Sequence, residues 1–134
     1  MQTLTSIPAQ DGFRMPAEYE KHLGCLLIWP VRKGSWTNGG KEAQKTFTQI
    51  ARAIAESEQV FMLCNEEDYD KVADVFKGDN NISVHVIKTD DAWARDTGPT
   101  CVVNNYGEVR GIDWKFNAWG GDYDGLYQDY ENDD

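Results

Sequence analysis

The chain has 134 residues, of which 40% are hydrophobic and 27% charged, and this composition is typical of one soluble globular domain with a modest core. The net charge of -10 argues against a nucleic-acid-binding protein, because that binding depends on Lys and Arg to neutralise phosphates. No apolar run is long enough to span a membrane, and the opening MQTLTSIPAQDG lacks the basic region and apolar core of a secretory signal, so we expect a cytoplasmic protein.

The first half of the sequence predicts a strand, a helix and a second strand. Residues 23–29, LGCLLIW, form a continuous apolar run closed by Pro30, which is typical of a strand buried on both faces. Residues 41–57 predict a helix, because their apolar side chains recur on one helical stripe. These side chains are Ala43, Phe47, Ile50, Ala51, Ile54 and Ala55. Residues 60–64, VFMLC, favour a second buried strand.

The second half predicts another helix, a strand and a hairpin. Asn65 is a good N-cap residue for a helix that ends at Gly78. Residues 82–87, ISVHVI, alternate as a strand does, with the aliphatic side chains on one face. The runs TCVVN and VRGIDWKF, joined at Asn-Tyr-Gly, predict a hairpin. The order of elements indicates an α/β fold, a mixed sheet with flanking helices.

Neither the cysteines nor the histidines indicate a metal site. Cys25, Cys64 and Cys101 are odd in number and far apart, which disfavours a disulfide framework or a CxxC motif. Each lies in an apolar run, so we expect each to be a small buried hydrophobe. His22 and His85 have no Cys or His at ligand spacing, so we predict no metal.

Residues 90–99, DDAWARDTGP, concentrate acid, base and indole directly after a predicted strand, where α/β proteins commonly place site residues. A carboxylate beside an indole suits a guanidinium, whose parallel N–H donors match both carboxylate oxygens and whose face stacks on aromatic rings. Asp96 and Trp93 therefore form a candidate guanidinium site, with Asp91 as a further acceptor. The competing interpretation is a capped turn in which Arg95 forms a structural ion pair and Trp93 is a core residue.

A second dense stretch, residues 113–121, reads DWKFNAWGG. Trp114 and Phe116 alternate with polar residues, so the pattern favours core packing, and the Gly pair permits positive φ or close backbone approach. Trp29 and Trp36 are likewise expected to be structural.

These two stretches, with GFRMPAEYEKH, LLIWPVRKGSW and GGKEAQKTF, resemble the agmatine deiminases, a branch of the bacterial peptidyl-arginine deiminase family. The resemblance spans nearly the whole chain. It implies the pentein fold, a five-bladed α/β propeller, and hydrolysis of agmatine to N-carbamoylputrescine and ammonia, a step of putrescine biosynthesis, without metal or organic cofactor. A chain of this length corresponds to roughly one to two of the five blades, so residues 1–134 look like the N-terminal part of a single deiminase-like domain.

The resemblance also implies a covalent mechanism, in which a Cys thiolate attacks the guanidinium carbon and a His acts as acid and then as base. By motif, Asp96 matches a guanidinium-binding carboxylate of the catalytic site, and Trp93 matches a wall of the substrate pocket. The family's His, second Asp and nucleophilic Cys lie on later segments with no match here. We therefore expect the chain alone to be inactive.

Two alternatives remain open at this point. The first is a truncated, non-catalytic module that binds guanidinium compounds or a partner chain, and the second is a chain that does not fold stably alone. Exposed strand edges would need a homo-oligomer, a complementing chain or the missing blades to cover them. Residues 1–12 are expected to be loosely held, and the acidic segment 122–134 to be disordered.

Overall fold

The structure, a computed structural model, describes residues 3–121, 123, 125 and 127–134. Its chain divides into two compact units, one formed by Met1–Lys21 with Gly98–Lys115 and the other by His22–Thr97 with Phe116–Asp134. The two are called the hairpin unit and the sheet unit below.

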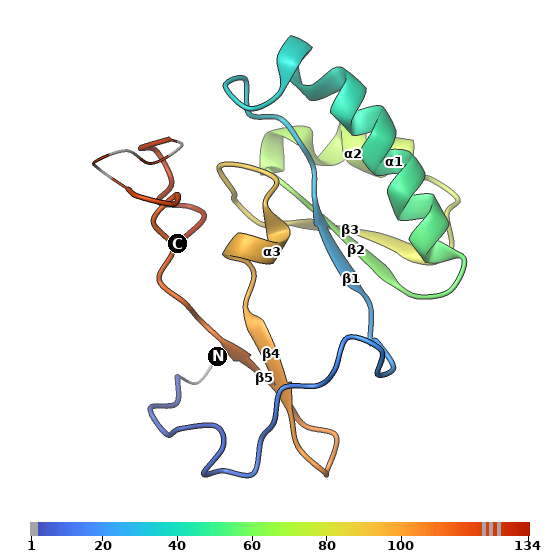
Figure 1. Ribbon diagram of the computed structural model, residues 1–134. Coiled ribbons are helices and arrows are strands. Elements are labelled where there is room, and N and C mark those ends of the chain that lie inside the picture. The colour runs from blue at the N-terminus through green and yellow to red at the C-terminus, as the bar shows by residue number, and fades with distance from the viewer. Residues whose placement is uncertain (1–2, 122, 124, 126) are drawn as a thin grey trace. The chain divides into compact units, whose positions relative to one another are not determined.

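The sheet unit is built on a three-stranded parallel sheet in the order β1-β2-β3. The strands are β1 (Cys25–Ile28), β2 (Val60–Cys64) and β3 (Ile82–Val86), and the helices between them are α1 (Lys41–Ala55) and α2 (Tyr69–Val75). Both helices cover the same face of the sheet (Figure 1). Short 3-10 turns, Thr37–Gly40 and Glu66–Asp68, lead into them. The predicted α/β architecture is confirmed.

The core of this unit lies between β2 and the two helices. Val60 and Met62 are fully buried, and Cys64 is nearly so. Around them pack the side chains of Trp29, Ala51, Val72 and Phe76. The central strand therefore supplies one face of alternating side chains to a single apolar layer, and this burial is the main source of stability.

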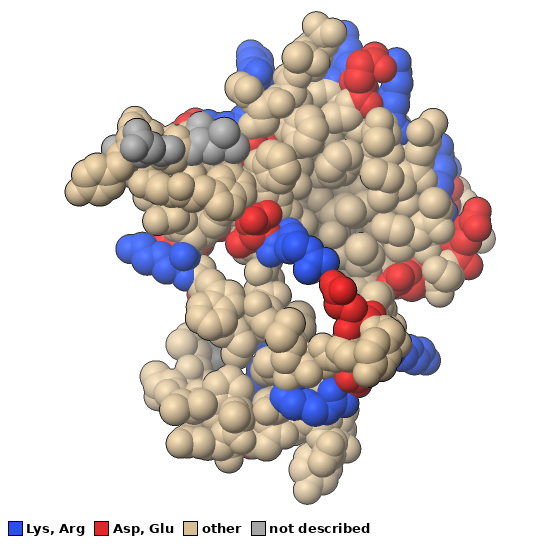
Figure 2. Space-filling view, viewed as in Figure 1, with Lys and Arg blue, Asp and Glu red and all other residues tan. Residues whose placement is uncertain are grey.

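The outer elements are more exposed than their sequence predicts. β1 was predicted to be buried on both faces, but it is an edge strand, and Leu26 is 43% exposed. On α1, Ile50 is 41% exposed, whereas Gln44 is buried and donates from Nε2 to the Pro30 carbonyl at 2.9 Å. An apolar stripe identifies the helix correctly, but the depth of each residue depends on how much of the sheet lies beneath it. On the face shown in Figure 2, the exposed surface of α1 carries basic and acidic side chains next to each other.

Asn65 occupies the predicted cap position but its side chain makes no capping hydrogen bond. Instead, Oδ1 accepts the Thr89 N–H at 2.9 Å and Nδ2 donates to the Thr89 carbonyl at 3.1 Å. The prediction of a side-chain cap was therefore wrong. The amide satisfies the backbone of the loop after β3, which holds residue 89 beside the end of β2. α2 ends at Val75, before the predicted stop at Gly78, which lies in the following turn with a φ of +94°.

The hairpin unit contains β4 (Thr100–Val103) and β5 (Val109–Ile112), which pair antiparallel as predicted. Arg14 forms a bridge with Val103, and the Arg110 guanidinium lies 3.8 Å from the centre of the buried Phe13 ring. β5 is shorter than the predicted strand, and Trp114 is 65% exposed, so the expectation that it packs in a core was wrong.

The three cysteines differ in burial. Cys64 is buried as predicted, but Cys25 is only half-buried and Cys101 is exposed. The apolar runs around the latter two belong to an edge strand and to a two-stranded hairpin, which bury fewer side chains than a central strand does. Across the part of the chain that the structure describes, no helix has the length and apolar character needed to cross a membrane.

Candidate functional site

Residues 90–97 of the DDAWARDTGP stretch follow β3 in the sheet unit, as expected for an α/β site. Residues 91 and 92 are buried, and the chain then makes a single helical turn, α3 (Ala94–Thr97). Within this turn the Asp96 N–H donates to the Trp93 carbonyl at 2.9 Å. The turn thus fixes the spacing of the two residues that the sequence singled out.

Asp91 is the most buried carboxylate of the stretch, at 2% exposure, and it accepts four hydrogen bonds. Its Oδ1 accepts the Trp36 indole N–H at 2.8 Å and the Ala92 backbone N–H at 2.8 Å. Its Oδ2 accepts the Trp93 indole N–H at 2.9 Å and the Ser35 hydroxyl. A buried charge needs such partners, because unpaired it would be strongly destabilising. Both oxygens are thereby committed to protein donors.

The indoles held by Asp91 belong to a larger aromatic cluster. Trp36 and Trp93 stack with ring centres 5.8 Å apart and planes 27° apart. Trp119 meets Trp93 edge-on at 5.8 Å, and Phe116 meets Trp119 edge-on at 5.2 Å. These offset and edge-to-face arrangements are the favourable ones for aromatic rings. The cluster joins the loop before α1, the loop after β3 and the C-terminal segment.

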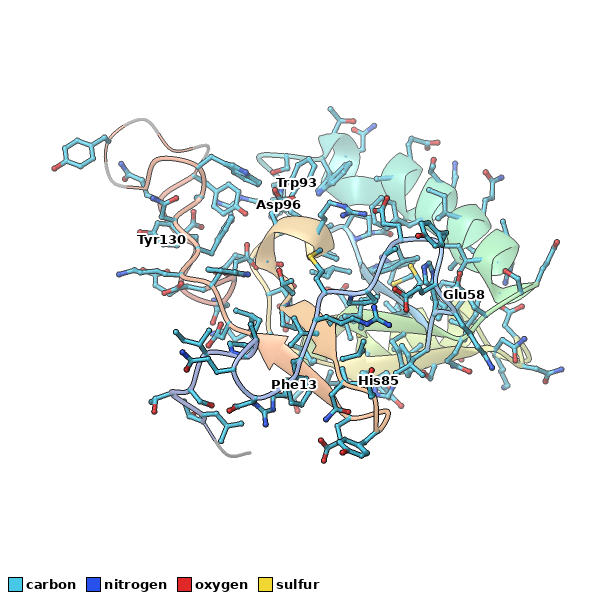
Figure 3. The ribbon with its side chains drawn as sticks, turned by 60° about the horizontal axis from the view of Figure 1, so that its bottom comes forward. Phe13, Glu58, His85, Trp93, Asp96 and Tyr130 are labelled. Atoms are coloured by element: carbon cyan, nitrogen blue, oxygen red, sulfur yellow. The ribbon has the colours of Figure 1, made fainter. Side chains whose placement is uncertain are left out.

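Asp96 lies at the edge of this cluster and is exposed. Its Oδ1 accepts the Trp119 indole N–H at 3.3 Å. Figure 3 shows Trp93 and Asp96 together at α3, with Tyr130 on the C-terminal segment. In contrast to Asp91, the Asp96 carboxylate is available to a ligand, beside indoles whose orientation is fixed by neighbours.

The C-terminal segment is attached to the loop through Asp133, which is buried. Its Oδ1 accepts the Asp90 N–H at 2.7 Å and the Asp91 N–H at 3.4 Å, and its Oδ2 accepts the Tyr127 hydroxyl at 2.9 Å. Burial raises the pKa of Asp133 above its usual value, and these donors only partly offset that effect. Burial, followed by the hydrogen bond to Asp133, raises the pKa of Tyr127.

Arg32 reinforces the same attachment. Its guanidinium carbon lies 4.0 Å from the centre of the Tyr127 ring, and its Nη2 pairs with the Asp129 carboxylate. Hydrogen bonding to Arg32 lowers the pKa of Asp129. Asn132 adds two bonds to Asp90, from its backbone N–H at 2.8 Å and its Nδ2 at 2.7 Å. The segment predicted to be disordered thus makes specific contacts through its described residues; positions 122, 124 and 126 lie outside the described residues.

The structure brings Trp93 and Asp96 together but gives Asp91, the further acceptor of the prediction, a different position. Asp91 is an internal anchor, and the exposed Arg95 lies at the surface of α3. The sequence reasoning missed the contribution of Trp119 and the pairing of Trp36 with Trp93. The shared indole chemistry of the two dense stretches was the available signal, since an indole N–H that is buried usually finds an acceptor.

A cleft of about 360 Å³ opens elsewhere in the sheet unit, at the carboxyl ends of β2 and β3. It is lined by Asn65, Glu66, Glu67, Val86, Lys88, Thr89 and Asp90. Within the described residues, no group of three or more His, Cys, Asp and Glu side chains is placed to hold a metal ion.

A sequence profile of the Porphyromonas-type peptidyl-arginine deiminases matches residues 14–134. The chain belongs to this family. Among curated proteins it is similar to the agmatine deiminase of Ectopseudomonas mendocina, at 51% identity over 134 residues, which is all of this chain and 36% of that protein. It is also similar to a putative agmatine deiminase of Selenomonas ruminantium, at 48% identity over all of this chain and 37% of that protein.

The fold agrees with the same family. The chain is similar to a solved structure of the agmatine deiminase of Enterococcus faecalis, with a TM-score of 0.93 and 40% identity over 98% of this chain and 36% of that one. A solved putative agmatine deiminase matches with a TM-score of 0.91 and 44% identity. This chain therefore spans a little over a third of the length of the relatives it matches.

Proposed function

We propose that this chain is the guanidinium-holding part of an agmatine deiminase, a cytoplasmic hydrolase of putrescine biosynthesis that needs no metal or organic cofactor. Asp96 binds guanidinium nitrogens through its exposed carboxylate, and Trp93 supplies a wall of the pocket. The observation that carries the proposal is the contrast between the two carboxylates: Asp91 is saturated by protein donors, whereas Asp96 is exposed beside the indoles. The names and fold of the relatives support it.

The proposal includes the five-bladed propeller of the family, of which this chain would make one to two blades. The strand order β1-β2-β3 leaves β1 and β3 as sheet edges within the described part of this unit. Edges of this kind are normally covered in native proteins. The rest of a longer polypeptide, or another chain, would cover them.

The chain by itself does not hydrolyse agmatine in this proposal, because none of its thiols suits a nucleophile. A nucleophilic Cys needs a lowered pKa. Burial raises the pKa of Cys64, and burial together with the Glu58 carboxylate raises the pKa of Cys25. Cys101 lies in the hairpin unit and outside any Gly-rich segment of the kind that the family resemblance requires.

The test is a chimera in which residues 1–134 replace the matching segment of the Ectopseudomonas mendocina enzyme. We expect the chimera to form N-carbamoylputrescine, and Asp96→Asn to lower its kcat/KM about 100-fold or more, because a charge-assisted hydrogen bond to the reacting group is lost. The matched control is Asp79→Asn, which removes a carboxylate that pairs with Arg52 in the last turn of α1. Equal activity of the Asp96→Asn and Asp79→Asn chimeras would contradict the assignment.

A second candidate is a non-catalytic module that binds guanidinium compounds. One observation favours it: every described contact that orients Trp93 and Asp96 comes from the sheet unit itself. The affinity of the chain for agmatine distinguishes this binding module from part of a deiminase. A module that works alone would bind agmatine at micromolar concentration, whereas a partial site with one carboxylate and one indole wall would bind at about millimolar concentration.

A further inference from the structure

We propose that Asp91 is a positioning residue that sets the plane of the Trp93 indole for guanidinium stacking. This inference rests on the proposed function, since it concerns the same pocket. It assigns to Asp91 a role distinct from that of Asp96: Asp91 contacts the pocket wall and not the ligand.

The geometry of the carboxylate supports this role. Asp91 is 2% exposed, and its two oxygens each accept one indole N–H, Oδ1 from Trp36 and Oδ2 from Trp93. One carboxylate therefore fixes both rings of the stacked pair, whose planes lie 27° apart. Only an acceptor with two equivalent oxygens can hold both indoles in this way.

The same carboxylate is itself held in place. The Ala92 N–H and the Ser35 hydroxyl complete its hydrogen bonds, and Asp133 anchors the backbone N–H of Asp91. Phe47 meets Trp36 edge-on at 5.9 Å and limits its tilt from the α1 side. A wall whose orientation is fixed before the ligand arrives loses less conformational entropy on binding, so its cation–π contribution is realised more fully.

The substitution that tests this inference is Asp91→Asn. An amide keeps one acceptor oxygen and replaces the other with an NH₂ donor, so it can hold only one of the two indoles. Each Trp gives one indole N–H resonance in a ¹⁵N–¹H spectrum, and Trp36→Phe and Trp93→Phe variants assign the two that matter. We expect Asp91→Asn to accelerate solvent exchange of at least one of these protons about tenfold or more. In the variant, the affinity for agmatine falls about tenfold.

Two further variants make the test decisive if Asp91→Asn does not fold. Ser35→Ala removes one donor from Oδ2 on a partly exposed loop, and we expect a smaller effect in the same direction, with Trp93 exchange rising more than Trp36 exchange. Asp79→Asn is the control and leaves both indole protons and the agmatine affinity unchanged. A general loss of stability would accelerate exchange throughout the sheet unit and would not single out Trp93.

The results that would overturn the positioning role of Asp91 differ from those that would overturn the guanidinium site. Unchanged indole exchange in both Asp91→Asn and Ser35→Ala would overturn the positioning role, as would unchanged agmatine affinity in a folded Asp91→Asn chain. Absence of agmatine binding by the unsubstituted chain would overturn the guanidinium site instead. In that case the indole exchange still decides whether Asp91 orients Trp93.

Discussion

At the scale of single residues, Trp119 has an unusual backbone that serves the site. Ala118 and Trp119 are consecutive non-glycine residues with positive φ, at +49° and +59°. Each left-handed residue costs about 1–2 kcal/mol, so such a pair persists only where the surroundings enforce it. Ala118 is fully buried, and the indole N–H of Trp119 donates to Asp96 Oδ1 at 3.3 Å. Strain of this kind concentrates at functional sites.

We predict that Trp119→Phe weakens agmatine binding about 3- to 10-fold while the fold is kept, because the ring remains but Asp96 loses its indole donor. Binding is measured by NMR titration of the chain. Trp114→Phe is the matched control, since Trp114 is exposed and donates its indole N–H to Thr100 in the hairpin unit. Equal losses in the two variants would show that Trp119 has no specific role in holding Asp96.

The burial of Asp133 predicts how the stability of the chain depends on pH. Because burial raises its pKa in the folded chain above the ordinary value of 3.8, the folded state favours the protonated carboxyl. Its stabilising contribution is therefore fully present below pH 3.8 and is lost as the pH rises through the folded pKa. Asp133→Asn mimics the neutral carboxyl at every pH. As the pH rises through the folded pKa of Asp133, we therefore expect the free energy of unfolding of Asp133→Asn to increase relative to that of the unsubstituted chain.

Urea unfolding at a series of pH values measures the difference, and the ¹³C titration of the Asp133 carboxyl should have a midpoint above 3.8. A midpoint below 3.8, with Asp133→Asn losing relative stability as the pH rises, would show that the donors from Asp90, Asp91 and Tyr127 outweigh burial.

At the scale of elements, the order and type of the main strands and helices could be predicted from hydrophobic periodicity, but their exposure could not. VFMLC became the central strand with its alternate residues buried, whereas LGCLLIW, equally apolar, became an edge. Periodicity reports which face of an element is apolar, while sheet position decides how much of that face is covered. The same limit applied at Ile50, which a helical stripe placed in the core.

In the candidate site, too, some residues could be predicted from local sequence and others could not. Asp96 and Trp93 could be singled out because a carboxylate and an indole stand three residues apart after a strand. The role of Asp91 could not, because its partner Trp36 lies 55 positions away and their contact depends on the packing of the loop before α1 on the loop after β3. Hydrogen bonds over such separations are properties of the fold and leave no local pattern.

The entry to α1 provides a stability prediction. Gly40 has a φ of +78°, and a Cβ there would lie 2.3 Å from the Pro30 carbonyl oxygen. Gly39 has a φ of +62° but no atom within 4 Å of the corresponding position. We expect Gly40→Ala to lower the free energy of unfolding by about 3 kcal/mol, from the combined backbone and overlap costs. Gly39→Ala should lower it by about 1 kcal/mol, from the backbone cost alone. Equal values in urea unfolding would contradict the close packing of this turn against the end of β1.

At the scale of the whole molecule, the chain belongs to the deiminase family but spans a little over a third of its relatives. The sheet unit contains the aromatic cluster, Asp91 and Asp96 together, so the proposed guanidinium site lies within one unit. The net charge of -10 favours a cationic ligand in general terms. In the proposed function, specificity for the guanidinium group instead depends on the exposed Asp96 carboxylate and the adjacent Trp93 ring.

We predict that the purified chain forms no N-carbamoylputrescine from agmatine, because burial raises the pKa of the Cys25 and Cys64 thiols, the two thiols of the sheet unit, and so makes them poor nucleophiles. A ureido-group assay measures the product. Turnover that survives purification and is abolished by substitution of one of the three cysteines would contradict this prediction.

The central claim is that Asp96 and Trp93 hold a guanidinium group. The most direct test is an agmatine titration of the chain followed at the Trp93 indole N–H resonance, with 1,4-diaminobutane as a dication that lacks the guanidinium. We predict saturable binding of agmatine at about millimolar concentration, from one ion pair and one cation–π contact, with loss of binding in Asp96→Asn and no response to 1,4-diaminobutane. An identical titration in Asp96→Asn, or an equal response to the diamine, would contradict the claim.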